Sequence, residues 1–153
     1  MSRALEDLIR VSDEVGQALA ERRPVVALET TLVAHGFPPG EGLAVGLESE
    51  RRVRAAGAVP ATIGVLDGLL HIGLSEEELG RFGPDSRKVG PRDLAAALVQ
   101  GAVGATTVGG TLAACRAVGI GFMGTGGLGG VHRGFPDPPD VSADLGELVR
   151  PRR

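Results

Sequence analysis

Short apolar runs alternate along the chain with segments whose apolar residues recur at helical spacing. The run Val25–Leu28 is uniformly apolar and leads directly into Glu29. This pattern predicts a short buried strand with a carboxylate at its C-terminal end. Ser12 is suited to cap a helix that ends near Arg22, and residues 41–56 predict a longer helix after the strand.

The middle of the chain predicts a β-hairpin. Two strand-like runs at residues 58–66 and 69–72 are separated by Asp67 and Gly68. An Asp-Gly pair favours the tight turn with positive φ that joins antiparallel strands. We therefore expect the two runs to pair, with His71 on the solvent side of the hairpin.

The second half of the chain continues the alternation. Ser75 and Glu78 have the spacing of a capping box for a short helix. Lys88 precedes Pro91, which suits the first turn of a helix, so we expect the lysine to lie just before that helix. The other expected elements are a helix from Pro91 to Gly101, a strand at 102–108, a helix at 111–118 that ends at Gly119, and a strand at 120–123.

Alternating helices and strands favour an α/β fold, in which a mixed, largely parallel sheet has flanking helices. Residues 1–153 are expected to form a single domain. In such sheets, ligands bind beyond the C-terminal ends of the strands. Glu29 and the glycine-rich segment 124–134 are expected at that edge.

Composition excludes some classes of protein. The net charge is −3, and four Phe with no Trp or Tyr leave few surfaces for stacking bases, so nucleic-acid binding is not expected. There is no run of 18 apolar residues and no N-terminal export signal, so we expect neither membrane insertion nor secretion. The lone Cys115 predicts buried packing rather than a disulfide, which fits the cytoplasm.

Two features suggest chemistry. Lys88 is the only lysine among 16 basic residues, and an amine, unlike a guanidinium, becomes a nucleophile once its pKa falls. The alternative is that Lys88 has no function and lies by chance on a solvent-exposed loop. Glu29 suits a general acid if partial burial raises its pKa, or it is an ordinary carboxylate bonded to a turn.

The segment 125–134 contains many glycines whose amides could hold an anion, or it is simply a tight connection. It also carries His132, a candidate phosphate contact. Asp137, Asp140 and Asp144 then follow closely and form a set of hard oxygen ligands suited to Mg²⁺ or Mn²⁺. Equally, Ser142 beside Asp144 could cap a final helix.

Taken together, these motifs resemble the pseudouridine-5′-phosphate glycosidases, also called the indigoidine synthase A-like family. The resemblance extends from about Ser12 to Val149. The matching segments are Val26–Thr31, Ala34–Gly36, Gly57–Ile63, Lys88–Val89 with Arg92–Asp93, Gly104–Val108, Gly126–Gly134 and Ser142–Leu145.

The resemblance implies an activity and a set of site residues. Family members reversibly split pseudouridine 5′-phosphate with water into uracil and ribose 5-phosphate, using a divalent metal, typically Mn²⁺. A glutamate protonates the ribose ring oxygen and a lysine amine forms an imine at C1 as uracil departs. The matched positions are Glu29 as proton donor, Asp140 as metal ligand, Lys88, Val108, Ser142, Ala143 and Asp144 as substrate contacts, and His132 and Arg133 as possible loop contacts.

The resemblance also implies a homotrimer and a longer chain. The nucleophilic lysine of the family lies in an Ala-Gly-x-Lys-Ser segment beyond the residues present here. The expectation is therefore an N-terminal half of the family fold that keeps the acid, the metal ligand and one lysine but lacks the nucleophilic lysine. The alternatives are an inactive fragment, a phosphosugar-binding module, or one half of a split enzyme.

Overall fold

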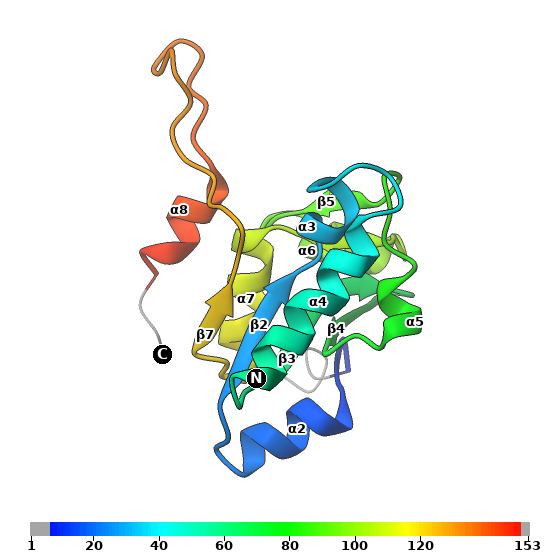
Figure 1. Ribbon diagram of the computed structural model, residues 1–153. Coiled ribbons are helices and arrows are strands. Elements are labelled where there is room, and N and C mark those ends of the chain that lie inside the picture. Colours follow the sequence, from blue (N-terminus) through cyan, green and yellow to red (C-terminus); the bar gives the residue numbers. More distant parts are fainter. Residues whose placement is uncertain (1–6, 151–153) are drawn as a thin grey trace.

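The computed structural model describes residues 7–150, which build a sheet of seven strands between two layers of helices (Figure 1). The strands are β1 (Ile9–Val11), β2 (Val25–Glu29), β3 (Val59–Leu66), β4 (Leu69–Ile72), β5 (Arg87–Val89), β6 (Gly104–Thr106) and β7 (Phe122–Gly124). The helices are α2 (Asp13–Ala20), α3 (Thr31–His35), α4 (Gly42–Ala55), α5 (Glu76–Leu79), α6 (Leu94–Val99), α7 (Val108–Val118) and α8 (Ala143–Leu148).

The sheet is mixed and largely parallel, as the sequence predicted. Its main path runs β1-β4-β3-β2-β7, and β6 pairs with both β3 and β5. The pairs β1/β4, β2/β3, β2/β7 and β5/β6 are parallel, whereas β3 is antiparallel to β4 and to β6. Glu29 ends β2, which lies between β3 and β7. It therefore lies at the C-terminal end of an inner strand, where ligand sites of such sheets form.

Two apolar clusters hold the layers together. One cluster, around the fully buried Ile63 and Ile72, packs the sheet against α2, α6 and α7. The other, around Leu66 and Leu79, packs the opposite face against α3, α4 and α5. All eight residues of β3 are buried, and β3 is central because it pairs with β2, β4 and β6. Removing a side chain such as that of Ile63 would cost about 2–5 kcal/mol.

Local turn and cap signals in the sequence are confirmed. Asp67 and Gly68 have φ of 53° and 78°, so the turn of the β3–β4 hairpin uses the left-handed region that an Asp-Gly pair tolerates. The Ser12 side chain caps α2, and the capping box of α5 has both of its hydrogen bonds. Gly119 ends α7 in a left-handed conformation with φ 80°.

Several boundaries differ from the prediction. Lys88 lies within a short strand, β5, rather than just before a helix, and α6 begins at Leu94 after a turn that contains Pro91. The strand expected at 102–108 is only β6, because Thr107 caps α7 by accepting a hydrogen bond from the Gly110 amide at 3.2 Å. The helix therefore begins three residues before Thr111, the predicted start.

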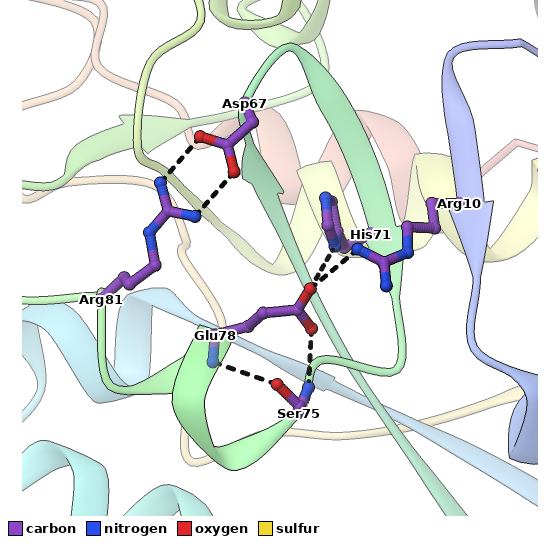
Figure 2. A network of polar contacts seen from close by, with 6 residues as sticks. All are labelled: Arg10, Asp67, His71, Ser75, Glu78 and Arg81. Carbon is purple, nitrogen blue, oxygen red and sulfur yellow. Dashed lines mark hydrogen bonds and ion pairs between the residues drawn. The ribbon is translucent and has the colours of Figure 1, made fainter.

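The expectation that His71 faces solvent was wrong. Its side chain is only 5% exposed, because α5 covers the face of β4 that the hairpin alone would leave open. Its Nδ1 atom lies 3.3 Å from Oε1 of Glu78, which also accepts a hydrogen bond from Arg10 at 3.0 Å (Figure 2). Burial lowers the pKa of His71, so the imidazole is favoured in its neutral form.

Candidate active site

Glu29 is held at the end of β2 by two hydroxyl groups. It is 9% exposed, and its Oε2 and Oε1 atoms accept hydrogen bonds from Thr31 and Thr125 respectively. Thr31 begins α3, whereas Thr125 follows β7, so two separate elements fix one carboxylate. The Thr31 hydroxyl also lies 3.1 Å from the carbonyl oxygen of Thr106. Such a carboxylate has a defined orientation and is shielded from bulk water.

A buried threonine network joins three neighbouring strands next to Glu29, which is in register with Ile63. The hydroxyls of Thr30 and Thr106 both donate to the carbonyl oxygen of Ile63, at 2.8 and 2.7 Å. Thr30 Oγ1 in turn accepts from the Thr106 amide at 2.8 Å, and Thr106 Oγ1 lies 2.9 Å from Thr111 Oγ1. These bonds connect β2, β3, β6 and α7. Because every hydroxyl has a partner, their burial fixes the floor of the site without an orphaned polar group.

Asp144 joins α8 to the start of α7. Its Oδ1 accepts a hydrogen bond from the Gly109 amide at 2.7 Å, and its Oδ2 accepts one from the Gly129 amide at 3.0 Å. Asp144 is 8% exposed, and Ser142 caps α8 as the capping alternative predicted. A carboxylate at the N-terminus of α7 is favoured by the helix dipole. The structure thus gives Asp144 two partners within the protein.

Residues 126–141 form an arm that extends away from the sheet (Figure 1). Val131 and Val141 make an antiparallel bridge between its two sides. Next to this bridge, the His132 amide donates to the Asp140 carbonyl at 3.0 Å, and His132 Nδ1 lies 3.2 Å from Asp140 Oδ2. Both side chains are mostly exposed, as is Arg133. The arm therefore presents polar groups to solvent rather than to Glu29.

The three aspartates expected to bind a metal are not gathered together. Asp144 is buried against α7, whereas Asp140 pairs with His132 on the arm. Within residues 7–150, no group of three or more His, Cys, Asp or Glu side chains is arranged to hold a metal ion. Asp140 and His132 supply two potential ligands, which do not make a complete site for Mn²⁺.

The other predicted contacts lie on different elements. Lys88 is exposed on β5, in register with Ala105 of the neighbouring strand β6. Val108 is buried at the first turn of α7. Ser142 and Ala143 line a cavity of about 460 Å³ together with Arg92, whose guanidinium suits a phosphate. Sequence reasoning assigned no role to Arg92, Thr31 or Thr125.

The space directly beside Glu29 is small. The cavity that includes Glu29, Leu32 and Gly124 measures about 20 Å³, far below the roughly 300 Å³ at which ligand pockets usually begin. A larger cavity of about 520 Å³, lined by Arg10, His71 and other charged residues, includes Pro60 near the start of β3 and so lies toward the opposite end of the strands. The geometry around Glu29 therefore provides a floor and an oriented acid but no enclosed pocket.

Cys115 takes no part in this site. It is buried in α7, and burial raises the pKa of its thiol to about 12, so the reactive thiolate is not formed near neutral pH. The packing role predicted for it is confirmed. Within residues 7–150 no helix is long and apolar enough to cross a membrane.

Comparisons with known proteins place this geometry in a family. A family model described as indigoidine synthase A like protein matches residues 14–152. A pseudouridine-5′-phosphate glycosidase from Chloroflexus aurantiacus is 53% identical over 146 residues, which are 94% of this chain and 48% of that protein. The enzyme of the same name from Dickeya dadantii is 48% identical over 95% of this chain and 47% of its own length.

Two solved structures have the same fold. The prealnumycin C-glycosynthase AlnA, in complex with ribulose 5-phosphate, matches 92% of this chain and 46% of its own with a TM-score of 0.79 and 46% identity. An indigoidine synthase A-like protein from Thermotoga maritima matches with a TM-score of 0.78 and 38% identity. The chain spans about half the length of the curated relatives it matches, corresponding to their N-terminal half. By sequence and by fold, this chain belongs to the indigoidine synthase A-like family.

Proposed function

We propose that this chain carries the acid and the phosphosugar contacts of a pseudouridine-5′-phosphate glycosidase. The complete reaction reversibly cleaves the C–C glycosidic bond with water to give uracil and ribose 5-phosphate. The observation that carries the proposal is the buried Glu29, with one hydroxyl donor on each carboxylate oxygen, in a chain 53% identical to a relative of that name.

In this proposal Glu29 gives a proton to the ribose ring oxygen as the ring opens. Thr31 and Thr125 restrain its carboxyl group, so the proton is offered in one direction. A carbon leaving group needs an electron sink at C1, and a lysine imine supplies one. Lys88 is exposed on β5, which suits a contact with the phosphosugar, and we assign the imine to a second lysine of the complete family site.

Phosphosugar binding is the part of the function best suited to this chain. Arg92, Ser142 and Ala143 share one cavity, and Lys88, which does not line that cavity, is a further exposed cation on β5. A relative holds ribulose 5-phosphate in its solved structure, which supports the same ligand class here. A phosphosugar-binding module is therefore the second candidate function. Cytoplasmic nucleotide metabolism and a homotrimer complete the proposal by family membership.

A divalent metal stays in the proposal only as an ion that Asp140 would bind. The described residues add His132 as a possible second ligand and do not complete a site, so we derive no reaction step through Mn²⁺. Calorimetry with MnCl₂ tests this assignment. We expect weak binding that the Asp140→Ala variant abolishes, and unchanged binding in that variant would contradict it.

The test of the function separates binding from turnover. Calorimetry with millimolar ribose 5-phosphate should give a measurable Kd, which Lys88→Ala weakens about tenfold and Lys88→Arg weakens less because the charge is kept. Glu29→Gln should bind as the wild type does. The absence of any heat at millimolar ligand would contradict phosphosugar binding by this half.

Turnover is followed as uracil release from pseudouridine 5′-phosphate, and a parallel incubation with borohydride reduces any imine to a stable adduct. We expect the chain by itself to release no uracil and to show no mass adduct on Lys88. Release of uracil by this chain without any addition would refute the assignment of the imine to a second lysine. In that case, loss of the activity in Lys88→Ala together with a borohydride-reduced adduct on Lys88 would identify this lysine as the nucleophile.

A further inference from the structure

The sheet has three outer strands, and they differ in how their edges are protected. β1 carries Arg10, and β5 carries Arg87 and Lys88, all with exposed side chains. Charged side chains of this kind discourage the addition of another strand. β7, with the sequence Phe122–Gly124, carries no charge and no proline, and within residues 7–150 it pairs with β2 alone. Figure 1 shows β7 on the outer side of β2.

Large apolar side chains are exposed around this edge. Phe122 is 72% exposed, and the end of α8 adds Leu148 at 48% and Val149 at 82%. A groove of about 160 Å³ lies among β7, α7 and α8, with Leu112 and Met123 in its wall. An uncharged strand edge beside exposed apolar groups is a surface suited to being covered by protein.

The ionic groups of the groove are already paired with one another. Glu147 of α8 is 3% exposed and forms ion pairs with Arg116 of α7 and with Arg150, whose Nε atom lies 3.3 Å away. These pairs fix α8 against α7 and leave the apolar side chains as the free part of the surface. A partner would therefore gain mainly from apolar burial and from strand pairing.

The length of the relatives identifies the occupant. The matched proteins align with 90–95% of the present chain, and that match accounts for only 44–49% of their own length. Their second half must pack on some surface of this first half. Arg150, the last described residue, lines the same groove as Phe122 at the start of β7. In the longer relatives, a strand that follows this position would lie parallel to β7, as in other β-α-β connections.

We infer that the free edge of β7, together with the groove between α7 and α8, is the docking surface for a polypeptide equivalent to the second half of the family. The added strand would end beside Thr125, and so one strand away from Glu29. It would supply a wall for the site, where the cavity beside Glu29 now measures about 20 Å³. The candidate active site is thereby completed by the same contact that covers the apolar edge.

The experiment uses the whole chain and the second half of the Chloroflexus aurantiacus relative, co-expressed as a separate polypeptide with a purification tag. We expect the two to co-purify and to give a 1:1 mass by light scattering. Phe122→Asp should weaken the complex about tenfold or more, because it places a charge in the apolar contact. The matched control is Val99→Asp on α6, where an apolar side chain is 89% exposed and remote from β7.

Amide hydrogen exchange gives a second, independent measurement. Residues 122–124 should exchange more slowly in the complex than in the free chain, with no change at residues 94–99. Failure to co-purify, or equal weakening by Phe122→Asp and Val99→Asp, would refute the inference. Protection of β7 by self-association of this chain alone would also refute it, by making a second copy the occupant. Since binding is measured without substrate, a complex that releases no uracil counts against the proposed reaction and leaves the docking surface supported.

Discussion

Two histidine–carboxylate pairs in this protein have almost the same separation in very different surroundings. His71 and Glu78 lie 3.3 Å apart beneath α5, and His132 and Asp140 lie 3.2 Å apart on the arm. The side chain of His71 is 5% exposed, whereas that of His132 is 73% exposed. An exposed contact between a histidine and a carboxylate contributes little to stability, whereas burial of His71 favours its neutral imidazole and fixes its packing. The contrast separates a rigid polar interior from a solvated arm, and the predictions below test that division.

The largest effect is expected where the arm joins the body. Asp144→Ala removes the acceptor of two backbone amides and the charge at the start of α7, so we expect the free energy of unfolding to fall by about 3 kcal/mol. Urea denaturation measures this loss. Asp140→Ala on the exposed arm is the control and should change stability by less than about 0.5 kcal/mol. Equal losses in the two variants would remove the distinction between the arm and its base.

A glycine pair at the same place should give a smaller difference. A Cβ atom on Gly129 would lie 2.1 Å from the hydroxyl of Ser142, whereas one on Gly130 meets nothing within 4 Å. We expect Gly129→Ala to destabilise the fold by about 1–3 kcal/mol and Gly130→Ala to be nearly neutral. Thermal unfolding of the two variants makes the comparison. A neutral Gly129→Ala variant would contradict the close approach of the Gly129 backbone to Ser142.

The smallest effect is a dependence on pH that arises from His71. Its pKa in the folded protein lies below the ordinary 6.5, chiefly because of burial, so below pH 6.5 the unfolded chain binds a proton that the folded chain resists. Stability attributable to this group is therefore complete above pH 6.5 and declines as the pH falls below it. We expect the loss between pH 7.5 and 5.5, measured by urea denaturation, to be smaller in His71→Gln than in the wild type. An identical slope in the two proteins would mean that the imidazole is not held neutral.

The sequence predicted best those features that depend on neighbouring residues. Asp67 and Gly68 specify the hairpin turn, and Ser75 with Glu78 specifies a helix start, because each signal acts within four residues. The alternation of elements predicted the mixed, largely parallel sheet. By contrast, β5 was not predicted, because it has three residues and two of these residues are charged and exposed.

The contacts of the site depend on residues distant in the chain and were not predictable from local patterns. Thr125 reaches Glu29 across 96 positions of sequence, and nothing near either residue indicates the contact. His71 was misassigned because a hairpin read by itself has one solvated face, whereas here α5 covers that face. Family resemblance identified Glu29 and Asp144, but only the structure shows what each one contacts.

The hydroxyl of Thr31 has a further consequence for proton transfer at Glu29. It carries one hydrogen and faces two acceptors, the Glu29 carboxylate and the Thr106 carbonyl oxygen. When the carboxylate is ionised the hydrogen can point to it, and when Glu29 is protonated the hydroxyl can rotate toward the carbonyl. Because the Thr31 hydroxyl can rotate between these two acceptors, a change of charge on Glu29 need not leave it without a hydrogen-bond partner. Thr31 would thus allow the acid to change its protonation state without the cost of reorganising the strands around it.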